Sequence, residues 1–280
     1  MLSSWRRSNL LSRILKEQLQ AAGTAFQLLT RIPVPVAIPF TPEVLARSVV
    51  YYPVVGAVIG GVVALAGMLL QDAVPAMPAA VILLAVWIAL SGGLHADGLM
   101  DTADGVMSHR SREKMLDIMK DSRVGAMGVL TAVLLLLFKF SSLTAVMNVS
   151  ELQWRSFFPL MMMACAWSRL WIVLAMAAFP FARPNEGMAS LFRAVHFRHP
   201  ASALLVTILL AAGSFLVWPS AGYQSAFVTL LMQGGITVAA GWILCIWLIR
   251  KLGGLTGDTY GAVAEIIESI LLFYLMLVLV

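Results

Sequence analysis

Long runs of apolar residues constrain the fold of this chain more than any other feature of its sequence. A helix needs about 20 apolar residues to cross a bilayer, and runs near that length lie at 49–70, 79–96, 126–147, 157–179, 201–218, 225–249 and 262–280. The runs are apolar on every face, whereas a membrane β-barrel requires strands of alternating polarity. The sequence therefore predicts an all-α, polytopic transmembrane bundle of about seven spans, forming one membrane-embedded domain over 1–280.

The distribution of Lys and Arg predicts how the bundle lies in the lipid bilayer. The chain is 60% hydrophobic and only 12% charged, with a formal net charge of +5. Five cations lie in 97–125 and three in 180–200, whereas 71–78 and 219–224 have none. Since Lys and Arg collect in cytoplasmic loops, we expect the N-terminus and the 92–125 segment to face the cytoplasm. The same loops account for the positive charge, so nucleic-acid binding is not expected.

The N-terminal segment, 1–35, differs from the spans. Apolar residues recur at helical spacing from Leu10 to Leu29, with a basic opposite face near the start. Pro33 and Pro35 then force extended backbone. This pattern predicts an amphipathic helix lying at the membrane interface.

An acidic segment, 92–125, interrupts the apolar pattern and is the first candidate site. If the helix arriving from the preceding run continues through it, Asp97, Asp101 and Asp104 fall at i, i+4 and i+7 and share one face. Three neighbouring carboxylates repel one another unless a cation lies among them, and Mg²⁺ prefers such hard oxygen ligands. Two alternatives stay open, since the pairs Asp97-Gly98 and Asp104-Gly105 can mark turns and the charges can pair within a solvated loop.

A second candidate site opens the last apolar run, where 253–261 reads GGLTGDTYG. A glycine-rich turn leading into a helix N-terminus, here at Thr256 and Gly257, presents backbone N–H groups to an anion such as phosphate. Asp258 and Glu265 are seven residues apart and therefore share a helix face. Glu265 lies inside the apolar run, where an ionisable group indicates function.

Two cations, Lys139 and Arg169, also lie within predicted spans. Either side chain at such a depth is suited to bind phosphate. For Lys139 the alternative is that its long side chain reaches the interface.

Several segments in one order resemble a known family. HADGLMDTADG, SREKMLDIMKDSRVG and GGLTGDTYGAVAE, together with FQLLTRIPVP near the N-terminus and ARPNEGM at 182–188, are similar to the cobalamin-5'-phosphate synthase family, also called adenosylcobinamide-GDP ribazoletransferase. The resemblance runs from the N-terminal segment to the last span. A single D-x₃-D pattern would be weak, but this string of motifs is specific.

The resemblance implies a Mg²⁺-dependent transferase of vitamin B12 assembly in a bacterial inner membrane. A hydroxyl of α-ribazole, or of α-ribazole 5'-phosphate, would attack the pyrophosphate of adenosylcobinamide-GDP. The products would be GMP and adenosylcobalamin or its 5'-phosphate. A homo-oligomer, and association with neighbouring pathway enzymes, stay open.

The residues and the resemblance together give a set of expected roles. Asp97, Asp101 and Asp104 would bind Mg²⁺ with Asp121 folding back towards them, and Asp97 and Asp104 would be catalytic, with Asp104 accepting the proton of the attacking hydroxyl. The remaining candidates would contact substrate: Arg123, Lys139, Arg169, Thr256, Gly257, Asp258 and Glu265.

Two other functions fit parts of the sequence. A cation-coupled transporter would use Glu265 and Arg169 along its pathway, but the carboxylates concentrate at the cytoplasmic end. A lipid enzyme similar to the CDP-alcohol phosphotransferases would also hold metal with aspartates from membrane helices. The chain lacks the Ala-Arg that those enzymes carry four residues after their first Asp-Gly, so this assignment is the less favoured one.

Overall fold

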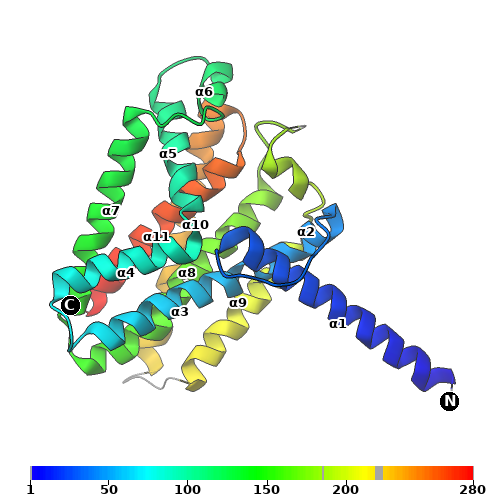
Figure 1. The fold of residues 1–280 in the computed structure, drawn as a ribbon, viewed down its shortest axis with the longest axis horizontal. Helices are drawn as coiled ribbons and strands as arrows, with labels where there is room; N and C mark the ends of the chain where they lie inside the picture. Colours follow the sequence, from blue (N-terminus) through cyan, green and yellow to red (C-terminus); the bar gives the residue numbers. More distant parts are fainter. Residues whose placement is uncertain (1, 185, 218–222, 280) are drawn as a thin grey trace.

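The protein is an assembly of helices, seen here in a computed structural model that describes residues 2–184, 186–217 and 223–279 (Figure 1). The α-helices in that part of the chain are α1 (Leu2–Leu29), α2 (Pro42–Ser48), α3 (Tyr52–Leu70), α4 (Ala76–Ser91), α5 (Leu94–Met107), α6 (Arg112–Ile118), α7 (Ala126–Met147), α8 (Glu151–Ala178), α9 (Arg198–Val217), α10 (Tyr223–Leu252) and α11 (Gly257–Leu279). Two short 3-10 helices, η1 (Val49–Tyr51) and η2 (Met188–Phe192), join them.

The predicted all-α membrane bundle is confirmed. Within the described residues, five helical segments are long and apolar enough to cross a membrane: Pro42–Leu70, Ala126–Met147, Trp154–Ala178, Phe227–Leu252 and Gly257–Leu279. The pair α4 and α5 passes the same test only when taken together. The remaining predicted span, 201–218, overlaps α9 but reaches residue 218, outside the described residues. The number of spans found is therefore five or six, against the seven predicted.

The predicted span 79–96 is not one straight helix. Helix α4 ends at Ser91, Gly92 and Gly93 adopt φ values of 65° and 69°, and α5 leaves at an angle of 89°. Side chains with a Cβ rarely adopt this left-handed conformation, so two consecutive glycines permit a bend that other residues resist. The acidic residues consequently lie on a helix of their own.

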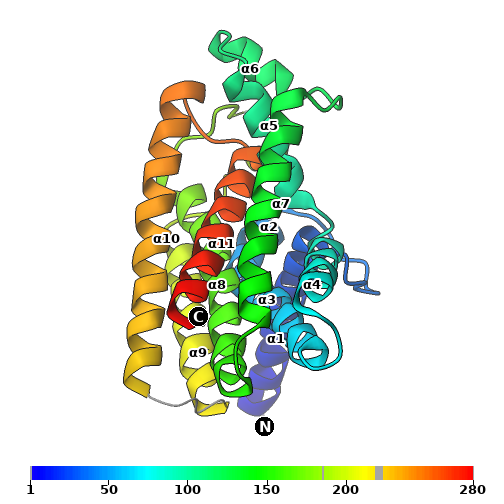
Figure 2. The same cartoon turned by 90° about the vertical axis from the view of Figure 1, so that its left-hand side faces the viewer.

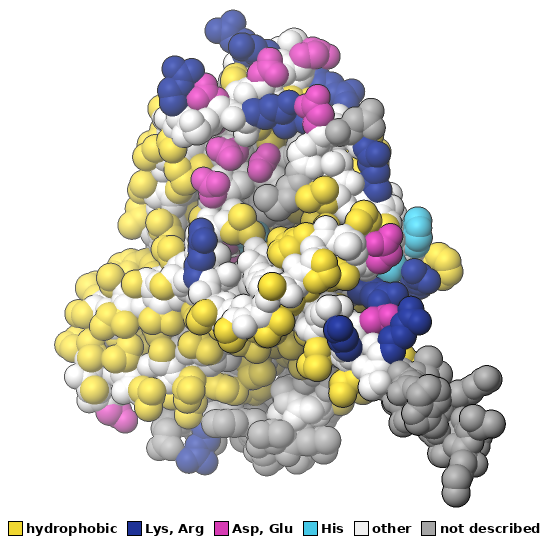
Figure 3. Space-filling view, turned by 45° about the vertical axis from the view of Figure 1, so that its right-hand side comes forward, with side chains coloured by type: hydrophobic (Ala, Val, Ile, Leu, Met, Phe, Trp, Pro, Cys, Tyr) yellow, Lys and Arg dark blue, Asp and Glu magenta, His cyan; other side chains and the backbone are white. Residues whose placement is uncertain are grey.

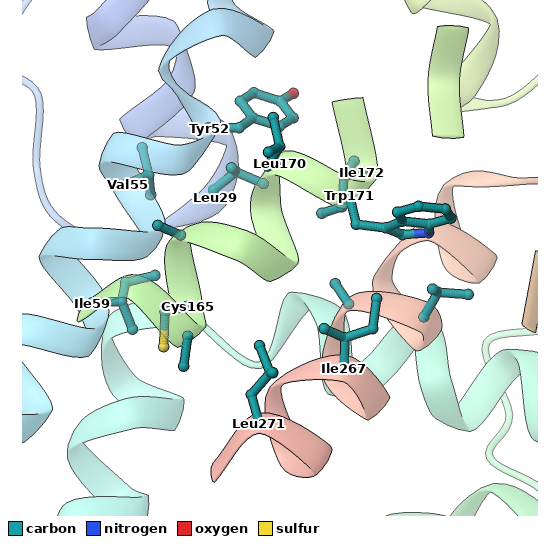
Figure 4. Close-up of a cluster of buried hydrophobic side chains, with 14 of the residues drawn as sticks. Leu29, Tyr52, Val55, Ile59, Cys165, Leu170, Trp171, Ile172, Ile267 and Leu271 are labelled. Atoms are coloured by element: carbon teal, nitrogen blue, oxygen red, sulfur yellow. The ribbon is translucent and has the colours of Figure 1, made fainter. Parts of the chain in front are cut away.

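Helix α8 forms the centre of the bundle. It packs most extensively against α3 and also against α11, α9 and α10. Figure 4 shows side chains of α8, such as Cys165 and Leu170, between Ile59 of α3 and Ile267 of α11. Removing these apolar surfaces from solvent and packing them closely holds α3 and α11 on either side of α8.

The outer faces of the bundle are apolar over a wide area. Helix α10 lies at the edge of the molecule (Figure 2), and Leu231, Met232 and Ile243 on it are exposed, as are Leu130 and Leu134 on α7. On the face seen in Figure 3, hydrophobic side chains gather at the left and lower left, and most Lys, Arg, Asp and Glu side chains lie towards the top and the right. A lipid bilayer is the environment that accommodates exposed faces of this kind.

Helix α1 extends the predicted N-terminal helix to residue 2 and projects away from the bundle (Figure 1). Its last turns are buried at Ala21, Ala25 and Leu29, whereas Leu15 and Leu19 are exposed. The exposed apolar side chains are compatible with the predicted interfacial position, which stays a prediction.

Candidate functional site

The acidic residues of α5 share one face, as their spacing predicts. Asp97, Asp101 and Asp104 all lie within Leu94–Met107, and so do both Asp-Gly pairs. The alternative that these pairs mark turns is therefore wrong, because the helix continues through both glycines. Asp97 is exposed, and Asp101 and Asp104 are half-buried.

Helix α11 packs closely on α5 and brings a fourth carboxylate to this face. A Cβ at Gly98 would lie 2.7 Å from the backbone oxygen of Asp258, so only glycine allows the observed approach. The charges of Asp97, Asp104 and Asp258 all act on Asp101 at this separation. The start of α11 is thereby placed beside the acidic face of α5.

The α5 and α11 carboxylates differ in whether they are already compensated. Asp97, Asp101 and Asp258 have no ion-pair partner among the described residues. No group of three His, Cys, Asp or Glu side chains in that part of the chain is close enough to hold a metal by itself. Mg²⁺ is commonly held by one or two carboxylates together with substrate phosphates, and these unpaired donors fit that mode of binding.

Asp104 has a different environment, because it caps the start of α7. Its Oδ2 accepts a hydrogen bond from the N–H of Gly125 at 2.7 Å, and its Oδ1 accepts one from Gly128 at 2.8 Å. Both carboxylate oxygens therefore satisfy N–H groups that a helix N-terminus leaves without intrahelical partners. This contact gives Asp104 a structural role that its spacing alone does not indicate.

Asp121 pairs with Arg123 in the connection between α6 and α7. Arg123 donates from Nε and from a terminal nitrogen, the latter at 2.6 Å from Oδ2. These hydrogen bonds lower the pKa of Asp121 to about 2. The charges that act on Asp101 are those of Asp97, Asp258 and Asp104. The metal-binding role of Asp121 and the substrate-binding role of Arg123 stay predictions.

A cavity of about 400 Å³ opens beside the acidic face of α5. Its polar lining comprises His95, Asp97, Lys120, Arg183, Thr256 and Asp258, with Glu186. The size is within the range of small-molecule sites. Asp97 and Asp258, which are far apart in sequence, therefore line the same cavity as the cations Lys120 and Arg183.

The connections that follow α8 and α10 lie side by side and carry Arg183 and Thr256 to this cavity. Phe181 and Leu255 form a β-bridge, in which the N–H of Ala182 donates to the oxygen of Leu255 at 2.8 Å. Arg183 donates to the backbone oxygen of Leu116 on α6. The segments 182–184 and 253–258, whose first residues are 71 positions apart in sequence, therefore lie side by side at the cavity.

The N-terminus of α11 is already partly satisfied by its own side chains. The N–H of Thr256 donates to Thr259 Oγ1 at 2.7 Å, and the N–H of Thr259 donates to Thr256 Oγ1 at 3.3 Å. Thr256 Oγ1 also donates to Asp258 Oδ2 at 3.3 Å. This cap fixes Thr256, Gly257 and Asp258 at the cavity, where all three line it.

Lys139 and Arg169 belong to a buried ion network on α7, α8 and α11. Lys139 lies 2.5 Å from Glu265 and 3.6 Å from Glu268, and Arg169 pairs with Glu268. The Lys139 ammonium also lies 4.1 Å from the centre of a Trp87 ring. Two cations and two carboxylates compensate one another at a depth where isolated charges are costly. None of these four residues lines the cavity, so their predicted contacts with substrate stay predictions.

Three residues of this region are not identified by the sequence patterns. Glu268 is the partner of Arg169, and its position in an apolar run is the signal that also marks Glu265. Arg183 and Lys120 line the cavity, but both come from loops rich in charge, where sequence gives no means of ranking one cation above another. The positions of Arg183 and Lys120 at the cavity depend on contacts between segments that are distant in sequence.

Comparisons with known proteins bear on the chemistry of this region. Residues 21–277 match the family described as cobalamin-5-phosphate synthase. The chain is 40% identical over 253 residues to a protein of Syntrophobacter fumaroxidans named adenosylcobinamide-GDP ribazoletransferase, covering 89% of this chain and 95% of that one. A Pseudomonas aeruginosa protein with the same name is 38% identical over 264 residues, which are 94% of this chain and 100% of the relative. No solved structure matches.

Proposed function

Because the chain belongs to the cobalamin-5-phosphate synthase family, we propose that the cavity beside α5 is where adenosylcobinamide-GDP reacts with α-ribazole or its 5'-phosphate. The protein is a transferase of cobalamin synthesis and an adenosylcobinamide-GDP ribazoletransferase like its relatives. The observation that carries the assignment of the site is that Asp97 and Asp258, from distant segments, line one cavity with Arg183 and Lys120.

The reaction breaks a phosphoanhydride bond and forms a phosphate ester bond. A ribose hydroxyl of the acceptor forms a bond to the phosphorus that carries cobinamide. The bond from that phosphorus to the bridging oxygen breaks, and GMP leaves with the electron pair. The hydroxyl proton passes to a carboxylate of the site.

Asp97, Asp101 and Asp258 are the residues that we assign to Mg²⁺. They are unpaired, they act on one another electrostatically, and Asp258 is held by the Thr256 cap. When bound, Mg²⁺ supplies positive charge that offsets the charge developing on the pyrophosphate. Binding by one or two of these carboxylates together with substrate phosphates agrees with the ligand preference of this ion.

Asp97 is the carboxylate that we assign to the proton of the attacking hydroxyl. It is exposed and lines the cavity, whereas both oxygens of Asp104 already accept backbone hydrogen bonds. Arg183 and Lys120 would hold phosphate oxygens, with the turn at Thr256 and Gly257 beside Arg183. We therefore assign the role of general base, which the sequence predicted for Asp104, to Asp97.

We place this site on the cytoplasmic side of a bacterial inner membrane. The loops that border it, 108–125 and 180–200, contain most of the Lys and Arg residues outside the N-terminal segment. Cytoplasmic loops carry such an excess. A nucleotide-activated substrate would reach the cavity from the compartment in which nucleotides are made.

The test is GMP release from adenosylcobinamide-GDP and α-ribazole by the purified protein in detergent. Release that requires both substrates and stops in chelator supports the assignment. A transporter would release no GMP under these conditions, because transport across a membrane has no meaning in detergent.

A further inference from the structure

The cavity has an apolar wall that the reaction at the carboxylates does not use. It is formed by Leu28, Leu29, Tyr52, Ile172, Met176 and Phe192. These residues come from α1, α3, α8 and η2, whereas the carboxylates come from α5 and α11. Figure 4 shows Leu29 and Tyr52 close together beside α8, with Ile172 further along that helix.

Two rings strengthen the aromatic character of this wall. Tyr52 and Phe192 pack edge to face with their centres 6.5 Å apart. Both are almost fully buried, with 2% and 4% of their surface exposed, so their positions are fixed by packing. Apart from the Tyr52 hydroxyl, the six side chains carry no hydrogen-bonding group.

The size and chemistry of the cavity indicate which part of the two substrates can bind there. A volume of about 400 Å³ suits a nucleoside, whereas a corrin ring with its side chains is several times larger. Guanine has N–H and carbonyl groups along its edge, which would be left without partners against this wall. The base of α-ribazole is a benzimidazole with two methyl groups, and its faces and edge are mainly apolar.

From this match we propose that the apolar wall binds the benzimidazole base of the acceptor nucleoside and so determines acceptor specificity. The inference rests on the proposed function. The base would lie along this wall, to which Tyr52, Phe192 and Ile172 contribute the 2% to 4% of their surface that is exposed, and the ribose hydroxyls would lie towards Asp97 and Asp258. The corrinoid and the guanosine of the donor then lie outside this wall.

The first experiment uses the wild-type protein, so it does not depend on any variant folding. GMP release is measured with α-ribazole or adenosylcobinamide-GDP varied in turn, in the presence of free dimethylbenzimidazole or of guanine. Dimethylbenzimidazole is expected to compete with α-ribazole and not with the donor, and guanine is expected to leave the KM of α-ribazole unchanged. Competition of dimethylbenzimidazole with the donor alone would overturn the inference.

The second experiment replaces one aromatic ring of the wall with an aliphatic side chain. Phe192→Leu is expected to raise the KM of α-ribazole about 10-fold, as expected for the loss of one aromatic contact, and to leave the KM of adenosylcobinamide-GDP within about 2-fold. Phe138→Leu is the matched control, because Phe138 lies on α7 against Phe273 and outside the cavity. A rise in the donor KM alone would contradict the inference. Absence of GMP release by the wild type would instead contradict the proposed function.

Discussion

At the scale of single residues, three aspartates with regular spacing have two different environments. Asp97 and Asp101 are unpaired and face a fourth carboxylate, Asp258, across the contact between α5 and α11. Asp104, one turn further, connects α5 to the start of α7 through two backbone hydrogen bonds. One helix face therefore carries both unpaired carboxylates and a capping carboxylate within two turns.

Asp104→Ala tests this division. Loss of both capping hydrogen bonds is expected to lower the free energy of unfolding by about 1 to 2 kcal/mol, measured by thermal or denaturant unfolding in detergent. Asp97→Ala is the matched control and is expected to leave stability unchanged or to raise it, because it removes a repelling charge. Equal stability of Asp104→Ala and wild type would contradict the capping role.

At the scale of helices, two kinds of contact set the position of α11. A close approach at Gly98 joins it to α5, and the ion network of Lys139, Arg169, Glu265 and Glu268 joins it to α7 and α8. Both contacts lie on the helix that carries Asp258. Substitutions at either contact are therefore expected to shift α11 and, with it, Asp258.

Gly98→Val tests the first contact. The new side chain would overlap the backbone of Asp258, where a Cβ alone lies 2.7 Å from the oxygen, so α5 and α11 must separate and activity is expected to fall at least 10-fold. Gly235→Ala on α10 is the control, because a Cβ there meets nothing within 4 Å. Wild-type activity of Gly98→Val would show that the helix separation does not matter to the site.

The ion network is tested by comparing single and paired substitutions. Lys139→Met alone leaves Glu265 buried without its partner and is expected to cost about 3 to 5 kcal/mol of stability. Lys139→Met combined with Glu265→Gln removes both charges and is expected to recover part of that loss. If the double variant lost as much stability relative to wild type as Lys139→Met and Glu265→Gln lose in sum, the pairing would be excluded as the cause.

At the scale of the whole molecule, orientation in the membrane follows from the charged loops. Lys114 in α6 and Asp72 between α3 and α4 are both exposed and are expected on opposite sides of the membrane. Each is replaced by cysteine in turn and labelled with an impermeant maleimide in right-side-out and inverted vesicles. Cys165 and Cys245 are free thiols buried in the bundle and provide a low background.

Lys114→Cys is expected to react only in inverted vesicles and Asp72→Cys only in right-side-out ones. The reverse pattern would place the cavity on the outer side of the membrane. Labelling of both cysteines in the same vesicles would place them on one side of the membrane. This result would contradict the single span predicted between them.

Much of the fold can be predicted from the sequence, because apolar runs and the spacing of charged residues are local properties. The runs locate the helices, and the i, i+4, i+7 spacing correctly places the aspartates on one face of α5. The bend at Gly92 and Gly93 is signalled by the glycine pair, but its angle depends on what α4 and α5 pack against. Pairings between distant helices, such as Arg169 with Glu268, require the tertiary structure.

The most direct test of a shared site on α5 and α11 is the rate of GMP release by Asp97→Asn, Asp258→Asn and the double variant. Asp72→Asn, a carboxylate outside the cavity, serves as the control. If Asp97 and Asp258 act as a unit, each single variant is expected to lose at least 100-fold in rate, and the double variant little more than either. A wild-type rate for Asp258→Asn would contradict the assignment of α11 to the site.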